Sequence, residues 1–144
     1  MLNKRQIMIE LDGLFQKVVK EENCQFKELL HENITPAQFM LLKLICHKAE
    51  CKAADIAQIL EVSPAAATNM LERLYKNGWI ERGRSEKDRR VVWLKLTPSG
   101  KELLTDVEAR RIDLMLERFK NVTEEEMVFI KKIFLNVLNN MKPD

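Results

Sequence analysis

The hydrophobic pattern of the chain changes its period after Gly78, and this change restricts the fold more than any other feature. Residues 53–77 place apolar side chains at helical spacing in two stretches, separated by a tight turn at 61–62 and a helix start at Ser63 and Pro64. The segments WIER and VVWLKL that follow largely alternate and are rich in Trp, Ile and Val, which is typical of strands. We therefore predict a helix, a turn, a second helix and a β-hairpin, in that order.

Helices are also predicted on both sides of this central region. An apolar stripe at helical spacing runs over residues 4–30, and its lapse near residues 21–25 leaves open whether the helix bends, ends or changes partner there. Proline and capping-box signals predict three more helices, over residues 36–47, 97–121 and 124–144. The expected fold class is mainly α (α+β), with about six helices and one small antiparallel hairpin.

The composition fits one soluble domain and excludes several other classes. The chain has 144 residues, of which 46% are hydrophobic and 32% charged, and no stretch of apolar residues is long enough to span a bilayer. Glu10 and Asp12 interrupt the N-terminal segment where a signal peptide needs an apolar run, so a cytoplasmic location is expected. Three cysteines are too few, and odd in number, for a disulfide scaffold, and they are interpreted as reduced thiols.

The small net charge of +2 hides a basic region. Residues 73–101 carry nine basic and three acidic side chains, whereas the rest of the chain carries fifteen basic and nineteen acidic ones. Such a concentration creates a local positive field, as expected of a surface that binds a polyanion. Double-stranded nucleic acid is the leading candidate partner.

A helix-turn-helix followed by a basic hairpin is the winged variant of a DNA-binding motif. The major groove of B-DNA, about 12 Å wide, admits one α-helix, and the helix over residues 63–77 suits it because small side chains near its start permit close approach. Ser63 and the amides at the helix N-terminus suit a phosphate, and the basic hairpin tip could follow the backbone and place an arginine in the minor groove. The candidate DNA-binding residues are Ser63, Pro64, Ala65, Ala66, Thr68, Asn69, Arg73, Arg84, Lys87, Asp88, Arg89 and Arg90.

From Thr35 to Leu104 the chain resembles the MarR family of bacterial winged-helix transcription regulators. The resemblance is carried by ADIAQILEVSPAAATNMLERLYKNGWIER and by DRRVVWLKLTPSGKELL. Its most specific element is the D-x-R signature at Asp88 and Arg90, which precedes a strand and a helix start. The resemblance implies that Asp88 buttresses Arg90 and that Arg90 enters the minor groove.

The chain departs from the family pattern at two places. Lys52 precedes the helix at residue 53, where the family usually has a Ser or Thr cap. Residues 65–67 are alanines, where family members often carry hydroxyl or basic groups, so DNA shape is expected to contribute to recognition. The aromatic residues Tyr75, Trp79 and Trp93 occupy apolar positions and are predicted to pack in the core or the hairpin.

The resemblance implies a single domain, residues 1–144, that forms a homodimer. Residues 1–34 and 103–144 would supply the dimerisation helices and residues 35–102 the DNA-binding region. The apolar stripes of the terminal helices agree, because they exceed what one small domain can cover. A dimer would bind a pseudo-palindromic operator with half-sites about one helical turn apart, and a small aromatic or phenolic effector, or an oxidant, would release it. A protein-interaction module without DNA binding remains an alternative.

The sequence gives little support to an enzyme. It contains no Gly-rich phosphate loop, no H-E-x-x-H and no G-x-S-x-G motif. No cofactor and no membrane partner are predicted.

The cysteines leave open a thiol-based redox sensor, because the family includes peroxide and thiol sensors. Cys24 and Cys51 are the candidate redox residues, and Cys51 is expected in an exposed loop. Cys46 lies in the apolar run FMLLKLIC and is expected to be a small core residue.

A metal sensor is the less favoured alternative. If the first helix is unbroken, its spacing places four groups that suit zinc on one face, namely Glu21, Cys24, Glu28 and His31. The chain has only two histidines, however, and none in its C-terminal helices, so no metal site is predicted.

Overall fold

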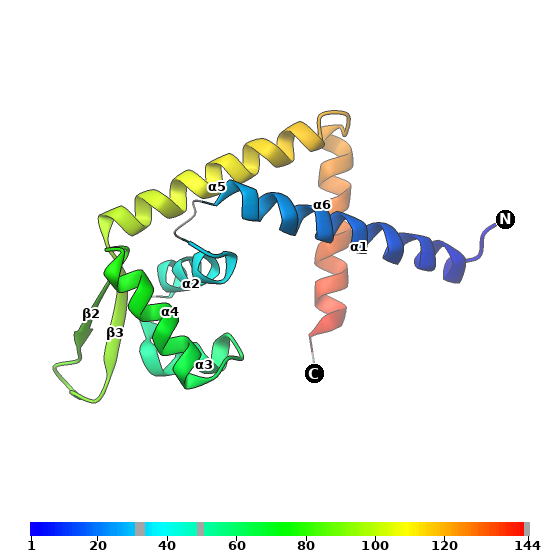
Figure 1. Ribbon diagram of the computed structural model, residues 1–144. Helices are drawn as coiled ribbons and strands as arrows, with labels where there is room; N and C mark the ends of the chain where they lie inside the picture. The colour runs from blue at the N-terminus through cyan, green and yellow to red at the C-terminus, as the bar shows by residue number, and fades with distance from the viewer. Residues whose placement is uncertain (31–33, 49–50, 143–144) are drawn as a thin grey trace. The chain divides into compact units, whose positions relative to one another are not determined.

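Six α-helices and three short β-strands account for most of the residues that the computed structural model describes, which are 1–30, 34–48 and 51–142 (Figure 1). They form two compact units, Met1–Ala109 and Arg110–Asp144. The mainly helical class with a small antiparallel sheet is confirmed. The elements are α1 (Lys4–Leu29), α2 (Pro36–His47), β1 (Cys51–Lys52), α3 (Ala53–Ile59), α4 (Pro64–Lys76), β2 (Ile80–Arg84), β3 (Val92–Leu96), α5 (Pro98–Arg118) and α6 (Glu124–Met141).

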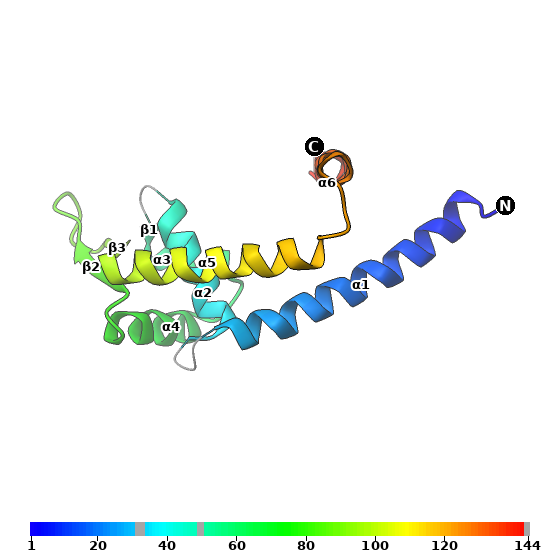
Figure 2. The same cartoon turned by 90° about the horizontal axis from the view of Figure 1, so that it is seen from above.

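Helix α1 runs without a break through the lapse in its apolar stripe, and the lapse separates an exposed part of the helix from a part that packs on the core. Every residue from Met1 to Glu21 is exposed. The C-terminal end of α1 instead lies beside α2 (Figure 2), where the rings of Phe26 and Phe39 meet edge to face with centroids 5.3 Å apart. Only this end of the helix belongs to the core of the first unit.

Local signals explain the helix-turn-helix. The turn between α3 and α4 places Glu61 at φ 53°, a left-handed conformation. The Ser63 hydroxyl then caps α4 by accepting a hydrogen bond from the Ala66 amide at 3.1 Å, and Pro64 occupies the first helical position. The expected departure at α3 is also present, because Lys52 makes no side-chain cap bond.

The sheet contains the predicted hairpin and one strand that was not predicted. The strand order is β1-β3-β2 with antiparallel pairing throughout, and Cys51 lies opposite Leu94. The expectation that Cys51 lies in an exposed loop is wrong, since its exposed fraction is 1%. A two-residue strand is too short to show alternation, and pairing with the edge of β3 is what buries this cysteine.

The core of the first unit is made by one face of each helix and by the inner face of the sheet. Buried residues of α2 follow helical spacing, and Cys46 falls outside them and is exposed, so its expected core position is wrong. The cause is the helical period, because a continuous apolar run in the sequence cannot face one side of a helix. The largest fully buried side chains are Phe39, Leu41, Leu42, Ile56, Leu74 and Val107.

The start of α5 is tied to the root of the hairpin. The Thr97 hydroxyl donates a 2.6 Å hydrogen bond to the carbonyl of Gly78 and accepts one from the Gly100 amide at 3.1 Å. A Cβ at Gly100 would overlap the carbonyl oxygen of Trp79. The threonine and glycine of the family-like segment are therefore explained by close packing of backbone on backbone.

The second unit contains the end of α5 and all of α6. Thr123 and Glu126 form the predicted capping box, and three glutamates lie in the first turn of α6, where the helix dipole favours them. Within the described residues, no helix combines the length and the apolarity that a bilayer crossing requires. The exposed apolar side chains of α6 are Val128, Phe129, Ile133, Phe134, Leu135, Val137, Leu138 and Met141.

Candidate nucleic-acid interface

Helix α4 presents a polar face because its larger aliphatic side chains, Met70, Leu71 and Leu74, pack into or against the core. Ala67 and Leu74 are buried, and Met70 packs against the same core. On the remaining surface the structure places a row of exposed candidate residues, with Ala66 half-buried beside them: Ser63, Pro64, Ala65, Thr68, Asn69 and Arg73.

Two of these side chains are already engaged with the helix backbone. The Thr68 hydroxyl donates to the carbonyl of Pro64 at 2.9 Å, so it offers a methyl group and acceptor lone pairs to a ligand. Ser63 Oγ accepts from the Ala66 amide at 3.1 Å, and the Ala67 amide bonds the Ser63 carbonyl at 3.0 Å. Because Pro64 has no amide proton, a phosphate at this helix end would have to use the Ala65 amide and the Ser63 hydroxyl proton.

The hairpin tip holds Arg90 beside Asp88 and leaves it exposed to solvent. Arg90 donates to the carboxylate of Asp88 from its Nε at 3.2 Å, from its Nη2 at 3.4 Å and from its backbone amide at 3.1 Å. The side chain of Arg90 is nevertheless 91% exposed, against 44% for Asp88. Hydrogen bonds from the Arg90 side chain and then from its backbone lower the pKa of Asp88, so the carboxylate stays charged.

The rest of the tip is ordered by its own hydrogen bonds. Arg84 Nη1 donates to the carbonyl of Arg89 at 3.1 Å, and the amide of Ser85 bonds the carbonyl of Val91 at 2.9 Å. The cationic side chains at this end of the hairpin all remain exposed: Arg84, Lys87, Arg89 and Arg90. The tip is therefore a compact surface on which four cationic side chains outnumber Glu86 and Asp88.

The structure brings the helix and the hairpin together around a hollow of about 450 Å³. Thr68 and Leu71 of α4 line one side, and Arg84 of β2 and Val92 of β3 line the other. Candidate residues that lie 16 positions apart in the sequence, Thr68 and Arg84, thus share one surface.

Sequence reasoning missed Arg82, which connects these two elements. Its Nη1 lies 3.1 Å from Glu72 Oε2, and its Cζ lies 4.3 Å from the ring centroid of Tyr75. Tyr75 is 44% exposed and packs on the hairpin through this contact. No sequence signal marks the pair, because Glu72 and Arg82 belong to different elements and each is an ordinary surface charge by itself.

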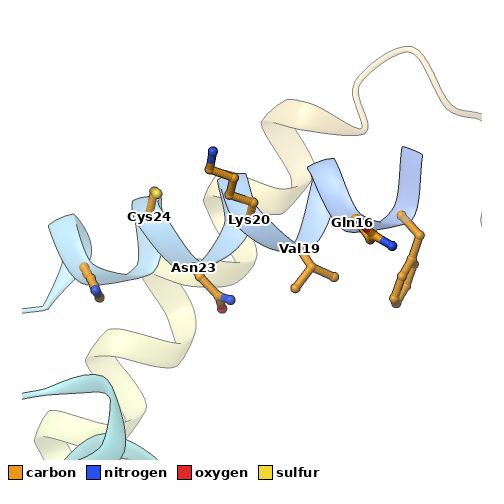
Figure 3. Close-up of a pocket in the computed structure, with 7 residues that line it drawn as sticks. Gln16, Val19, Lys20, Asn23 and Cys24 are labelled. Carbon is orange, nitrogen blue, oxygen red and sulfur yellow. The ribbon is translucent and has the colours of Figure 1, made fainter. Parts of the chain in front are cut away.

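The candidate redox residues differ in their surroundings. Cys24 is exposed and lies along a hollow of about 430 Å³ whose lining comes from α1 alone, and Figure 3 shows Cys24 and Lys20 on one side of that helix with Asn23 and Val19 on the other. Burial raises the pKa of the Cys51 thiol, against an opposing contribution from Lys48. Cys51 therefore lacks the exposed thiolate that a reactive cysteine needs.

The face of α1 considered for zinc extends to a residue outside the described part of the chain, His31. Within the part that is described, no group of three or more His, Cys, Asp or Glu side chains is arranged to hold a metal ion.

Comparisons with known proteins agree with this geometry. The MarR family model matches residues 34–92. The HTH-type transcriptional repressor MdtR of Bacillus subtilis is 35% identical over 122 residues, which cover 85% of this chain and 77% of MdtR. Such relatives are DNA-binding regulators and not enzymes.

Solved structures of MarR family proteins superimpose on this chain over nearly its whole length. A MarR family protein from Bacillus stearothermophilus superimposes with a TM-score of 0.84 at 21% identity, covering 98% of this chain and 99% of that one. A mutant of MarR from Escherichia coli, solved in complex with operator DNA, superimposes with a TM-score of 0.68 at 30% identity, covering 95% and 99%. The winged-helix fold, the family model and the relatives together show that the chain belongs to the MarR family of DNA-binding transcriptional regulators.

Proposed function

We propose that this chain represses transcription by occupying a pseudo-palindromic operator as a homodimer. The observation that carries the proposal is Arg90, which is held by Asp88 and is almost fully exposed at the tip of a basic hairpin beside α4. Two similar proteins give further support, since MdtR is named a repressor and E. coli MarR was solved on operator DNA.

Helix α4 would lie in the major groove. Ala65 and Ala66 permit close approach to the DNA, and Asn69 has the donor and acceptor pair that suits the N6 and N7 edge of adenine. Thr68 would contact a thymine methyl group or a base amino group, because its own proton is held by Pro64. Arg73, one turn further on, would bind a phosphate or a guanine.

The hairpin would follow the DNA backbone into the neighbouring minor groove. Arg90 is the side chain expected to enter the groove, where a narrow A·T-rich segment enhances the negative potential. Arg84, Lys87 and Arg89 would contact phosphates, and Asp88 would act only by holding Arg90. Recognition of groove shape would compensate for the few base-reading side chains on α4.

A second copy of the chain would cover the apolar surfaces of the terminal helices. The residues involved lie in 1–34 and 103–144, where α1 and α6 expose long apolar stripes. Single exposed apolar residues are ordinary, but contiguous stripes of this kind mark an interface. Two-fold symmetry would place the two α4 helices on half-sites about one helical turn apart, and the chain would work in the cytoplasm as one domain.

Release of the DNA would follow from a shift of α4 against the hairpin. The hollow between them combines the apolar side chains Leu71 and Val92 with the cations Arg82 and Arg84. A small aromatic or phenolic effector has a matching flat apolar body and an oxygen that Arg84 could bind. Oxidation of the exposed Cys24 is the alternative signal, and it would act through the α1 surface.

The proposal can be tested by fluorescence anisotropy on a duplex taken from upstream of the chain's own gene, with a scrambled duplex as control. The wild type is expected to bind the specific duplex more tightly, with affinity that falls steeply as salt rises. Arg90→Ala is expected to weaken binding on the specific duplex. Binding that shows no salt dependence and is unchanged by Arg90→Ala would instead favour a protein-interaction module.

A further inference from the structure

Arg82 of β2 contacts two residues of α4 at once. Its Nη1 lies 3.1 Å from Glu72 Oε2, and its guanidinium carbon lies 4.3 Å from the centre of the Tyr75 ring. Glu72 and Tyr75 are three residues apart on the helix and so share one side of it. We propose that Arg82 is a positioning residue that fixes α4 against the hairpin, so that both elements meet DNA in register. The inference rests on the proposed function, in which both elements contact one duplex.

The need for such a contact follows from how α4 and the sheet meet. Ile80 at the root of β2 is buried, and Leu94, which lies opposite Arg82 in the sheet, is buried as well. Beyond this packed root, the space between α4 and the sheet is the hollow of about 450 Å³, and Arg82 lines it. The core therefore fixes α4 against the root of β2, and further along the strand Arg82 reaches across to α4 through its contacts with Glu72 and Tyr75.

Arg82 lies on the strand that leads directly into the hairpin tip, so its contacts affect where the tip lies. Residue 84 ends β2, two residues after Arg82, and the tip that follows carries Arg90. A small rotation of β2 against α4 would be carried along the strand to the tip. Such a rotation would move Arg90 out of the minor groove while Asn69 of α4 stays in the major groove.

Arg82 is unsuited to be a DNA ligand itself. Its guanidinium donates to the carboxylate of Glu72 and lies over the ring of Tyr75. These two contacts within the protein already engage the positive charge that a phosphate would otherwise attract. Glu72 adds a negative charge beside the DNA-binding face, which would be unfavourable for DNA if it served no other purpose. Removing the charge of Glu72 should therefore raise DNA affinity if the residue has no positioning role and lower it if the residue holds Arg82.

The first variant is Glu72→Gln, measured by anisotropy on the specific duplex. Electrostatics alone predicts tighter binding, because a negative charge is removed from the neighbourhood of DNA. Loss of the contact to Arg82 predicts weaker binding, by roughly two- to five-fold if the exposed pair is coupled to DNA affinity. Glu81→Gln is the matched control, since it removes one negative charge from the residue of β2 next to Arg82 and should tighten binding slightly or leave it unchanged.

The second set of variants separates positioning from phosphate contact. Arg82→Gln is expected to weaken binding roughly five-fold while leaving the dependence of log affinity on log salt unchanged. Lys87→Gln, at the tip, is expected to reduce that slope by about one. Tyr75→Leu should weaken binding, whereas Tyr75→Phe keeps the ring under Arg82 and should bind like the wild type.

Rescue provides the strongest readout. The double variant Glu72→Arg with Arg82→Glu reverses the pair and should recover most of the affinity lost in either single variant. Melting temperatures of all variants show whether they are folded, and Glu72→Gln and Tyr75→Leu keep the test informative if Arg82→Gln is not.

The outcomes distinguish the two proposals. Tighter binding by Glu72→Gln, or a salt slope reduced by about one in Arg82→Gln, would overturn the positioning role alone, because the wild type would still bind its operator. Absence of specific binding by the wild type would overturn the proposed function and this inference with it.

Discussion

Asp88 accepts three hydrogen bonds from Arg90, and yet the arginine side chain remains almost fully exposed. The carboxylate thus restricts the direction of the arginine without covering it. A long side chain that is held before binding loses less conformational entropy when it enters a groove. The main role of the contact between Asp88 and Arg90 is therefore to orient Arg90, and not to stabilise the fold.

Asp88→Asn tests this interpretation. Asparagine keeps one acceptor for the Arg90 amide but loses the charged two-point contact with the guanidinium. We expect operator affinity to fall roughly two- to five-fold, although the change removes a negative charge near DNA. Anisotropy with Glu86→Gln as a charge-matched control measures the effect, and tighter binding by Asp88→Asn would contradict it.

The lowered pKa of Asp88 sets the pH range in which this orientation persists. A carboxylate whose pKa is lowered by folding contributes above its unfolded value, about 3.9, and the contribution is lost as pH falls through the lower folded value. Between about pH 5 and 8 the charge on Asp88 should therefore not change. The ratio of wild-type to Asp88→Asn affinity should be constant over this range, and a ratio that drifts below pH 6 would show that Asp88 titrates there.

Gly100→Ala is expected to destabilise the chain. The added methyl group would overlap the backbone carbonyl of Trp79, which cannot turn away as a side chain can, and overpacking of this kind costs about 1–3 kcal/mol. Gly13→Ala is the control, since nothing lies within 4 Å of its Cβ position and alanine stabilises a helix interior by about 0.5–1 kcal/mol relative to glycine. Urea unfolding of the two variants should move in opposite directions.

The three thiols should react at different rates. Cys24 and Cys46 are exposed, whereas Cys51 is buried and its pKa is raised by burial. At neutral pH we expect two thiols to react quickly with a disulfide reagent and the third only on unfolding, with Cys51→Ser removing the slow phase alone. The pKa of Cys51 is higher in the folded state than in the unfolded state, so the unfolded state loses the thiol proton first as pH rises. The free energy of unfolding should therefore decline above about pH 8.5 more in the wild type than in Cys51→Ser.

The sequence predicts the elements of this fold better than it predicts the environment of single residues. Proline, capping and period signals place the helices and the hairpin to within a few residues, because these signals act locally. Strand β1 and the burial of Cys51 were missed, since a two-residue strand is made by its neighbour β3 and leaves no pattern of its own. The apolar run around Cys46 predicts a buried side chain, but the helical period places Cys46 on the exposed side of α2.

In the candidate site, too, features within one segment were predicted and contacts between elements were not. The exposed face of α4 follows from spacing within one element, and the contact between Asp88 and Arg90 is one that the family resemblance implies. The contact of Arg82 with Glu72 and Tyr75 joins a strand to a helix, so it depends on tertiary packing that no local pattern encodes. Charge partition along the chain found the basic region but could not show which of its arginines are engaged inside the protein.

Phe134→Asp is expected to convert the proposed dimer into a monomer. Phe134 lies in the exposed apolar stripe of α6, and a carboxylate placed in a dehydrated interface would lose its hydration without gaining a partner. Asn136→Asp is the control, because it adds the same charge to the opposite side of the helix. Sedimentation analysis should give a dimer for the wild type and the control and a monomer for Phe134→Asp. The monomer should also lose most of its affinity for a two-half-site operator while keeping weak affinity for one half-site, since α4 and the hairpin are unchanged. A Phe134→Asp protein that remains dimeric and binds the full operator normally would place the dimer interface elsewhere.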